Sequence, residues 1–80
     1  MSTLQWYRSM LCEEYGDELT SRVLDDPAFA GFVGEVHALE GGELEGVACE
    51  VAYHAVDHLY EHPEDSANDA YAELRRRMRG

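Results

Sequence analysis

The sequence contains no lysine, no isoleucine and only two cysteines. Cys12 and Cys49 are far apart and form no Cys-x-x-Cys motif, so they do not make the disulfide framework of a small secreted domain. Both fall within predicted helices rather than in a strained turn or at a helix N-terminus, where a reactive thiolate is favoured. We therefore expect both to pack in the core and neither to act as a nucleophile.

Long apolar runs are also missing. No stretch approaches the roughly 20 apolar residues that a membrane-spanning helix needs. The first residues, Met-Ser-Thr-Leu-Gln-Trp-Tyr-Arg, contain no apolar run of signal-peptide length. We therefore expect no membrane association and a cytoplasmic location.

Basic residues are few, and they are unevenly placed. The chain has 17 Asp and Glu against six Arg, a formal net charge of −11. All 17 acids lie in residues 1–74, where Arg8 and Arg22 are the only basic residues, so this part carries −15. Such a field repels nucleic acid and attracts basic surfaces. Even with four arginines in the last six residues, we expect no direct binding to duplex nucleic acid.

The chain is short, which limits the kind of site it can build. Eighty residues form one domain that buries roughly 60–65% of the surface of its unfolded chain. A deep, dry substrate pocket would take up much of so small a core. There is no Gly-rich phosphate loop, and paired carboxylates are expected by chance among so many acids. We therefore expect a protein that is not an enzyme and carries no cofactor.

Helix boundary signals are frequent in the first part of the chain. Ser2 and Gln5 fit a capping box, and Gly16 suits the residue after a helix C-terminus, so a helix is predicted over 3–15. A shorter helix is predicted over 17–25. Asp26-Pro27 then reads as an N-cap followed by a proline at the first helical position.

The second part of the chain is punctuated just as clearly. Gly41-Gly42 ends the third predicted helix, and a long helix is predicted over 43–61. Pro63 stops that helix, because proline disfavours helix in the residue before it. A fifth helix is predicted to begin between Pro63 and Ser66, with Glu64 and Asp65 in its first turn.

Apolar residues recur at helical spacing, and strand signals are weak. The sequence therefore predicts an all-α fold, a compact four- or five-helix bundle in one domain spanning 1–80. The helix over 43–61 is the best candidate for the central one. The first, third, fourth and fifth predicted helices each have a set of residues expected to face inward. In this order, the sets are Leu4, Tyr7, Met10 and Leu11; Phe29, Phe32, Val33, Val36 and Leu39; Leu44, Val47, Ala48, Val51, Ala55 and Leu59; and Ala67, Ala70, Tyr71, Leu74 and Met78.

A histidine stripe on the fourth predicted helix is the only candidate metal site. Glu50, His54, His58 and His62 are four residues apart and share one side of a helix. The pair His54-x-x-x-His58 has the spacing at which two imidazoles bind one zinc ion. The alternative, that the stripe is the solvent-facing side of an amphipathic helix, has more support because no ligand from a second helix is evident.

The leading functional hypothesis is a small acidic module that binds a partner protein. Carboxylates on a rigid helical scaffold can replace nucleic-acid phosphates on a basic, nucleic-acid-binding surface and thereby inhibit or regulate its owner. Phage-encoded DNA mimics and anti-CRISPR proteins are similar in size and charge, although no residue pattern links the chain to them. The residues predicted to bind the partner are Glu13, Glu14, Asp17, Glu18, Asp25, Asp26, Glu40, Glu43, Glu45 and the partly exposed Trp6.

Two hypotheses from other classes compete with this one. The first is a small structural or assembly protein, as a homodimer, whose acidity reflects adaptation to high salt. The second is a metal-binding helical domain that uses His54 and His58.

Tyr53 and Tyr60, at the edge of the apolar stripe of their helix, extend the set of aromatic residues that an interface would use.

Overall fold

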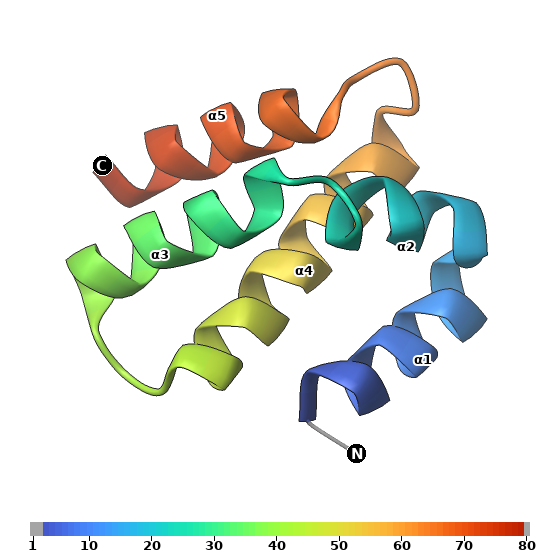
Figure 1. Cartoon of the computed structure of the whole chain (residues 1–80). Helices are drawn as coiled ribbons and strands as arrows, with labels where there is room; N and C mark the ends of the chain where they lie inside the picture. The colour runs from blue at the N-terminus through green and yellow to red at the C-terminus, as the bar shows by residue number, and fades with distance from the viewer. Residues whose placement is uncertain (1–2, 80) are drawn as a thin grey trace.

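The computed structural model describes residues 3–79, and the side chains of 3–78, and it confirms an all-α bundle (Figure 1). Ser2, half of the predicted capping box, lies outside the described residues. No strand occurs within residues 3–79. The five helices are α1 (Thr3–Tyr15), α2 (Asp17–Leu24), α3 (Ala28–Glu40), α4 (Leu44–Glu61) and α5 (Ala67–Arg79).

The turns lie where the sequence places glycine and proline. Gly16 separates α1 from α2 with a φ of 94°, and Gly41 and Gly42 separate α3 from α4 with φ values of 74° and 88°. These left-handed conformations are costly for residues with a Cβ. The Asp26 carboxylate accepts a hydrogen bond of 2.8 Å from the backbone N–H of Ala28, as an N-terminal cap does.

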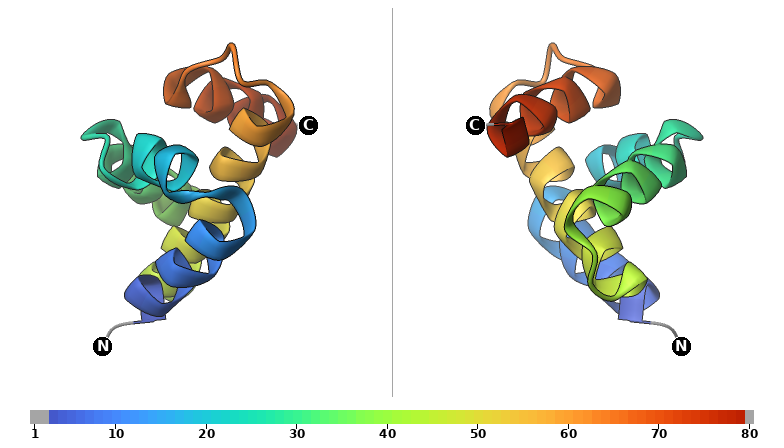
Figure 2. Two further views of the ribbon diagram at one scale, coloured as in Figure 1. Left: turned by 90° about the vertical axis from the view of Figure 1, so that its right-hand side faces the viewer. Right: turned by 90° about the vertical axis from the view of Figure 1, so that its left-hand side faces the viewer.

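Helix α4 is the centre of the fold, as predicted. It packs against each of the other four helices, whereas α3 and α5 contact each other much less. In the side views of Figure 2, α5 and the α2–α3 segment stand apart while both border α4. Small and β-branched residues let the surrounding helices approach α4 closely. Its buried residues are Val47, Ala48, Cys49, Val51, Ala52, Ala55, Val56 and Leu59.

Three residues expected to face inward do not. Leu39 is 70% exposed, Leu44 is 55% exposed and Met10 is 41% exposed, so the prediction was wrong for each. Leu39 and Leu44 flank the glycine turn, at the end of the α3–α4 hairpin, where fewer neighbouring side chains cover them than at mid-helix. Met10 lies on the outer side of α1, whereas Leu11, the buried residue of this helix, faces the core.

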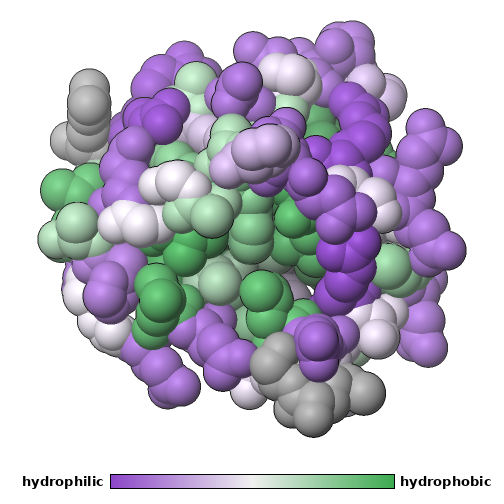
Figure 3. Space-filling view, viewed as in Figure 1, coloured by the Kyte–Doolittle hydropathy of each residue, from purple (hydrophilic) through white to green (hydrophobic). Residues whose placement is uncertain are grey.

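The five short helices leave part of the apolar surface uncovered. Hydrophobic side chains gather in the middle of the face drawn in Figure 3, between borders of hydrophilic ones. A groove of about 480 Å³ lies between α3, α4 and α5. Apolar residues form much of this groove, and charged residues and His54 complete it. The lining residues are Phe32, Val36, Glu40, Glu50, Val51, His54, Leu74, Arg77 and Met78.

Helix α5 begins later than expected, at Ala67, so Glu64 and Asp65 precede its first turn. A capping box sets this start. The Ser66 backbone N–H donates to Asp69 Oδ2 at 2.8 Å, and the Asp69 N–H donates to Ser66 Oγ at 3.3 Å. The hydrogen bond from the Ser66 backbone lowers the pKa of Asp69. The Ser-x-x-Asp pattern was readable in the sequence and was missed.

Ser66→Ala is expected to lower the free energy of unfolding by about 1 kcal/mol, because it leaves the N-terminus of α5 without its side-chain cap. Chemical denaturation followed by circular dichroism measures the change. Ser9→Ala is the matched control, since Ser9 Oγ donates only to the Gln5 carbonyl within α1. Equal effects of the two substitutions would contradict a capping role for Ser66.

Candidate protein-binding face

Four exposed acids form a corner where α1 meets α2. Glu13 and Glu14 end α1, and Asp17 and Glu18 begin α2; we call these four the acidic corner. No hydrogen bond or ion pair among the described residues engages their carboxylates. Asp17 and Glu18 also favour their own helix, because negative charge near a helix N-terminus is stabilising. The acidic corner therefore presents four carboxylates to solvent on rigid backbone.

The other two acids predicted in this half of the chain have partners within the protein. Asp25 forms two hydrogen bonds with Arg8, from Nη1 to Oδ1 at 3.0 Å and from Nη2 to Oδ2 at 3.1 Å. The Arg8 guanidinium lowers the pKa of Asp25. Asp26 caps α3, as described above. Both carboxylates therefore have structural roles. The sequence predicted the role of Asp26 as an N-cap, but it did not predict the pairing of Asp25 with Arg8.

A second acidic group surrounds the glycine turn. Glu40 and Glu43 are exposed, and Glu45 is half-buried. Figure 1 places this turn and the acidic corner on opposite sides of the molecule. The predicted acids therefore do not make one continuous face. They make two separate groups.

A row of tyrosines lies between α1 and α4. Tyr15 of α1 meets Tyr53 and Tyr60 of α4 edge-on, with ring centroids 6.4 and 5.3 Å apart. The Tyr15 hydroxyl donates to Asp57 Oδ1 at 3.1 Å. Burial, and then this hydrogen bond, raise the pKa of Tyr15. We call Tyr15, Tyr53, Asp57 and Tyr60 the tyrosine face.

The α4 rings of the tyrosine face, which the sequence placed at the edge of the apolar stripe, are open to solvent. Tyr53 is 38% exposed and Tyr60 is 58% exposed. The roles of Tyr15 and Asp57 were missed. The spacing of Tyr53, Asp57 and Tyr60, four and then three residues, marks one side of a helix and is the signal that was available.

Two glutamates extend the negative charge near the tyrosine face. Burial raises the pKa of Tyr7, and so do the nearby Cys49, Tyr53, Glu14 and Glu50. Tyr15 of the tyrosine face lies in the chain between Glu14 and Asp17 of the acidic corner. The acidic corner and the tyrosine face are neighbours.

Trp6 is 56% exposed, which confirms that it is partly open. Met10 and Glu13 follow it at spacings of four and three residues and are exposed as well. Trp6 therefore belongs to the outer side of α1. It extends the aromatic surface of α1 away from the buried seam with α4.

No family model, curated protein or solved structure matches this chain. Its functional assignment therefore rests on its own residues. Within residues 3–79, no helix is both long and apolar enough to cross a membrane.

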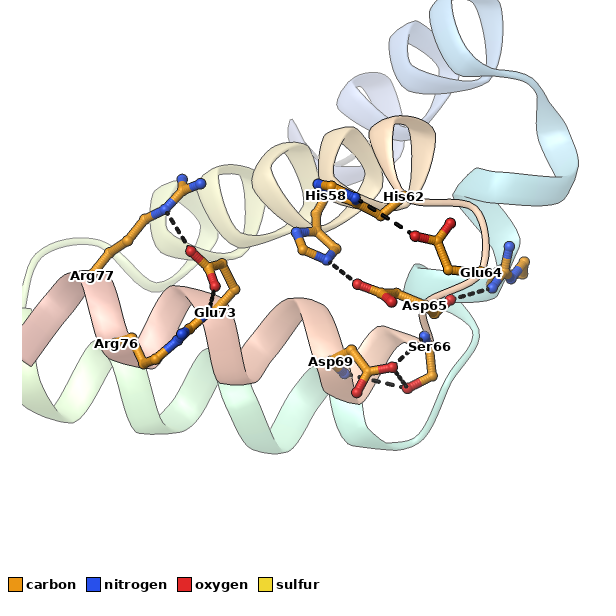
Figure 4. Close-up of polar contacts among 10 residues, drawn as sticks. His58, His62, Glu64, Asp65, Ser66, Asp69, Glu73, Arg76 and Arg77 are labelled. Atoms are coloured by element: carbon orange, nitrogen blue, oxygen red, sulfur yellow. Dashed lines mark hydrogen bonds and ion pairs between the residues drawn. The ribbon is translucent and has the colours of Figure 1, made fainter.

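The histidine stripe is engaged in contacts near the start of α5 (Figure 4). His58 Nε2 lies 2.8 Å from Asp65 Oδ2, and His62 Nδ1 lies 3.7 Å from Glu64 Oε1. The rings of His58 and His62 are 4.9 Å apart, whereas His54 stands edge-on to Tyr53 at 5.4 Å. In the described part of the chain no three His, Cys, Asp or Glu residues are grouped as metal ligands.

Three arginines of α5 bind acids of the same molecule. Arg75 forms two hydrogen bonds with Glu35 of α3, at 2.6 and 3.0 Å, and its guanidinium lies 5.0 Å from the centre of the Phe32 ring. Arg76 and Arg77 both pair with Glu73 (Figure 4). These three positive charges are therefore partly neutralised within α3 and α5. They do not offset the acidic corner.

The two cysteines differ in burial. Cys12 is half-buried, and Cys49 is buried on α4, as predicted. Burial and the nearby Glu45 raise the pKa of Cys49. A raised pKa keeps this thiol protonated, which is the form suited to packing in a core.

Proposed function

We propose that this protein is a binding module that occupies a basic, nucleic-acid-binding surface of a partner protein and thereby inhibits or regulates it. The observation that carries the proposal is the acidic corner, whose four carboxylates have no partner among the described residues and are held on two helices. The helices fix the backbone of these residues before binding, so only side-chain freedom is lost when a partner binds.

The distribution of positive charge supports the same proposal. Arg8 pairs with Asp25, and Arg75, Arg76 and Arg77 pair with Glu35 and Glu73. Among the described residues, Arg22 at the end of α2 has no carboxylate partner and donates to the Asp65 carbonyl at 2.8 Å instead. This single charge offsets the four acids of the corner only in part. A negative field accelerates encounter with an Arg- and Lys-rich groove and makes the association sensitive to salt.

The partner is identified by affinity capture at low salt from a lysate of the source organism, followed by elution at high salt. Displacement of a labelled nucleic acid from the purified partner then tests whether the two ligands occupy one surface. Binding of both at once would contradict the proposal. Loss of helical structure of the free protein at low salt would instead favour the structural, salt-adapted alternative.

Neutralising the acidic corner is expected to weaken binding to this partner. The variant Glu13→Gln/Asp17→Asn/Glu18→Gln should lose about tenfold in affinity and show a shallower salt dependence, because three exposed charges are removed. Isothermal titration calorimetry at several salt concentrations measures both. Circular dichroism verifies that α2 remains folded.

The matched control removes the same charge at the glycine turn, through Glu40→Gln/Glu43→Gln/Glu45→Gln. This control should lose less than about threefold, because the turn lies on the opposite side of the molecule. Equal losses in the two variants would mean that net charge alone governs binding. Unchanged affinity in both would refute the electrostatic mechanism.

A further inference from the structure

The exposed rings of the tyrosine face alternate with carboxylates along α4. Glu50, Tyr53, Asp57 and Tyr60 follow one another at spacings of three, four and three residues, which places them in a row along one side of the helix. Glu61, also exposed, comes directly after Tyr60. Each open ring therefore has a carboxylate one helical turn away or adjacent in the chain.

Tyr15 holds this row in a fixed arrangement. Its ring meets those of Tyr53 and Tyr60 edge-on, and its hydroxyl donates to Asp57 between them. Edge-on packing leaves ring surface available to solvent, and Tyr53 and Tyr60 are indeed exposed. Rings that are already positioned lose little side-chain entropy when a ligand binds.

The chemistry of this row fits the guanidinium group better than any other common side chain. A guanidinium stacks on an aromatic ring while it donates two parallel hydrogen bonds to a carboxylate. The lysine ammonium is a compact, strongly hydrated charge that lacks the planar fork. A surface that combines open rings with carboxylates therefore distinguishes arginine from lysine.

The protein already contains one such unit. Arg75 lies 5.0 Å from the centre of the Phe32 ring and forms two hydrogen bonds with Glu35. An aromatic ring and a glutamate together thus hold a guanidinium in this fold. The tyrosine face offers the same two components with no arginine of the described residues upon them.

We propose that the tyrosine face is an arginine-selective docking surface that binds two arginine side chains of the partner's basic surface, one at Tyr53 and one at Tyr60. This inference rests on the proposed function, since it names which cations of a basic partner are recognised. The acidic corner beside it supplies the long-range attraction, and the rings supply the discrimination.

Two peptides of equal length and charge test the inference, one with arginines spaced by glycine and serine and one with lysine at each arginine position. Calorimetry should give an arginine-peptide affinity at least about fivefold higher than that of the lysine peptide. In Tyr53→Leu/Tyr60→Leu the two affinities should become equal. The variant Tyr53→Phe/Tyr60→Phe keeps both rings and should keep the preference for the arginine peptide. Loss of that preference in this variant would contradict the role of the rings, so the test stands even if the leucine variant fails to fold.

The outcomes separate this inference from the proposed function. Equal binding of both peptides to the unmodified protein, weakened when the acidic corner is neutralised, would overturn the arginine preference and leave electrostatic binding intact. Absence of binding by either peptide at low salt would overturn both. A homodimer that dissociates in the leucine variant, seen by analytical ultracentrifugation, would assign the face to a second copy and overturn the inference.

Discussion

Leu59→Ala is expected to lower the free energy of unfolding by about 2–5 kcal/mol. Leu59 is 0% exposed on α4, the helix that packs against all the others. The substitution removes apolar contacts and leaves a cavity that the surrounding helices fill only in part. A domain of this size has a total stability of only about 4–12 kcal/mol. The variant should therefore unfold at a much lower denaturant concentration, measured by far-UV circular dichroism.

Leu39→Ala is the matched control for this experiment. It deletes the same atoms from a side chain that is 70% exposed, so the change should be within about 0.5 kcal/mol. A loss at Leu39 as large as that at Leu59 would mean that Leu39 is covered in solution. That result would contradict the exposure of Leu39 at the end of the α3–α4 hairpin.

Tyr71→Phe is expected to stabilise the protein by about 1 kcal/mol, a rare sign for a core substitution. Tyr71 is 1% exposed, and its ring stacks on Phe32 with centroids 4.6 Å apart. Its buried hydroxyl has no hydrogen-bond partner in the described part of the chain. An unpaired buried hydroxyl carries a desolvation cost that phenylalanine lacks, while the stacked ring is retained. Denaturant unfolding at neutral pH measures the gain.

The unfolding free energy of Tyr71→Phe should depend less on alkaline pH than that of the unmodified protein. Burial raises the pKa of Tyr71 to about 12, above its ordinary value of 10.0. The folded state therefore holds this proton more tightly, and the associated stability is complete below about pH 10 and is lost as the pH rises through about 12. Tyr71→Phe should flatten the decline in unfolding free energy over this range. Tyr15, whose pKa is also raised, should leave a residual decline.

Tyr60→Phe is the matched control for the stability effect of Tyr71→Phe at neutral pH. Tyr60 is exposed, so loss of its hydroxyl should change the stability by less than about 0.5 kcal/mol. Destabilisation by Tyr71→Phe would show that the buried hydroxyl has found a partner, such as an ordered water, and would refute the expected sign.

The sequence was informative about helix boundaries because these are set locally. Gly16, Asp26 and Gly41 each act through their own backbone or the next few residues, and their turns lie where they were predicted. The start of α5 was predicted too early because Pro63 also fits a helix start, whereas the capping pair that sets it begins at Ser66. Local signals of this kind require no knowledge of the tertiary structure.

Burial at the ends of helices was not predictable in the same way. Periodicity identifies the apolar side of one helix, but it does not indicate where the neighbouring helix ends. Leu39 and Leu44 continue the apolar stripes of α3 and α4 and are nevertheless exposed. Their exposure depends on how the ends of neighbouring helices are placed, which is a property of the assembled bundle.

The candidate site was predicted only in part, for a similar reason. The sequence placed Trp6 beside the apolar series of its helix and Tyr53 and Tyr60 at the edge of theirs, and all three are exposed. The contact between Tyr15 and Asp57 joins residues 42 positions apart and depends on how α1 packs along α4. Helical spacing alone does not fix that alignment.

The position of α4 also affects how freely the surface of this protein can diversify. Helix α1 packs mainly on α2 and α4, and α5 packs mainly on α4 and α3, so α4 is the one neighbour that both share. Substitutions more than about 7–10 Å apart without shared partners contribute additively to stability. Outward-facing residues of α1 and α5 point away from this shared neighbour and meet that condition, so we expect substitutions on one helix to need no compensating changes on the other.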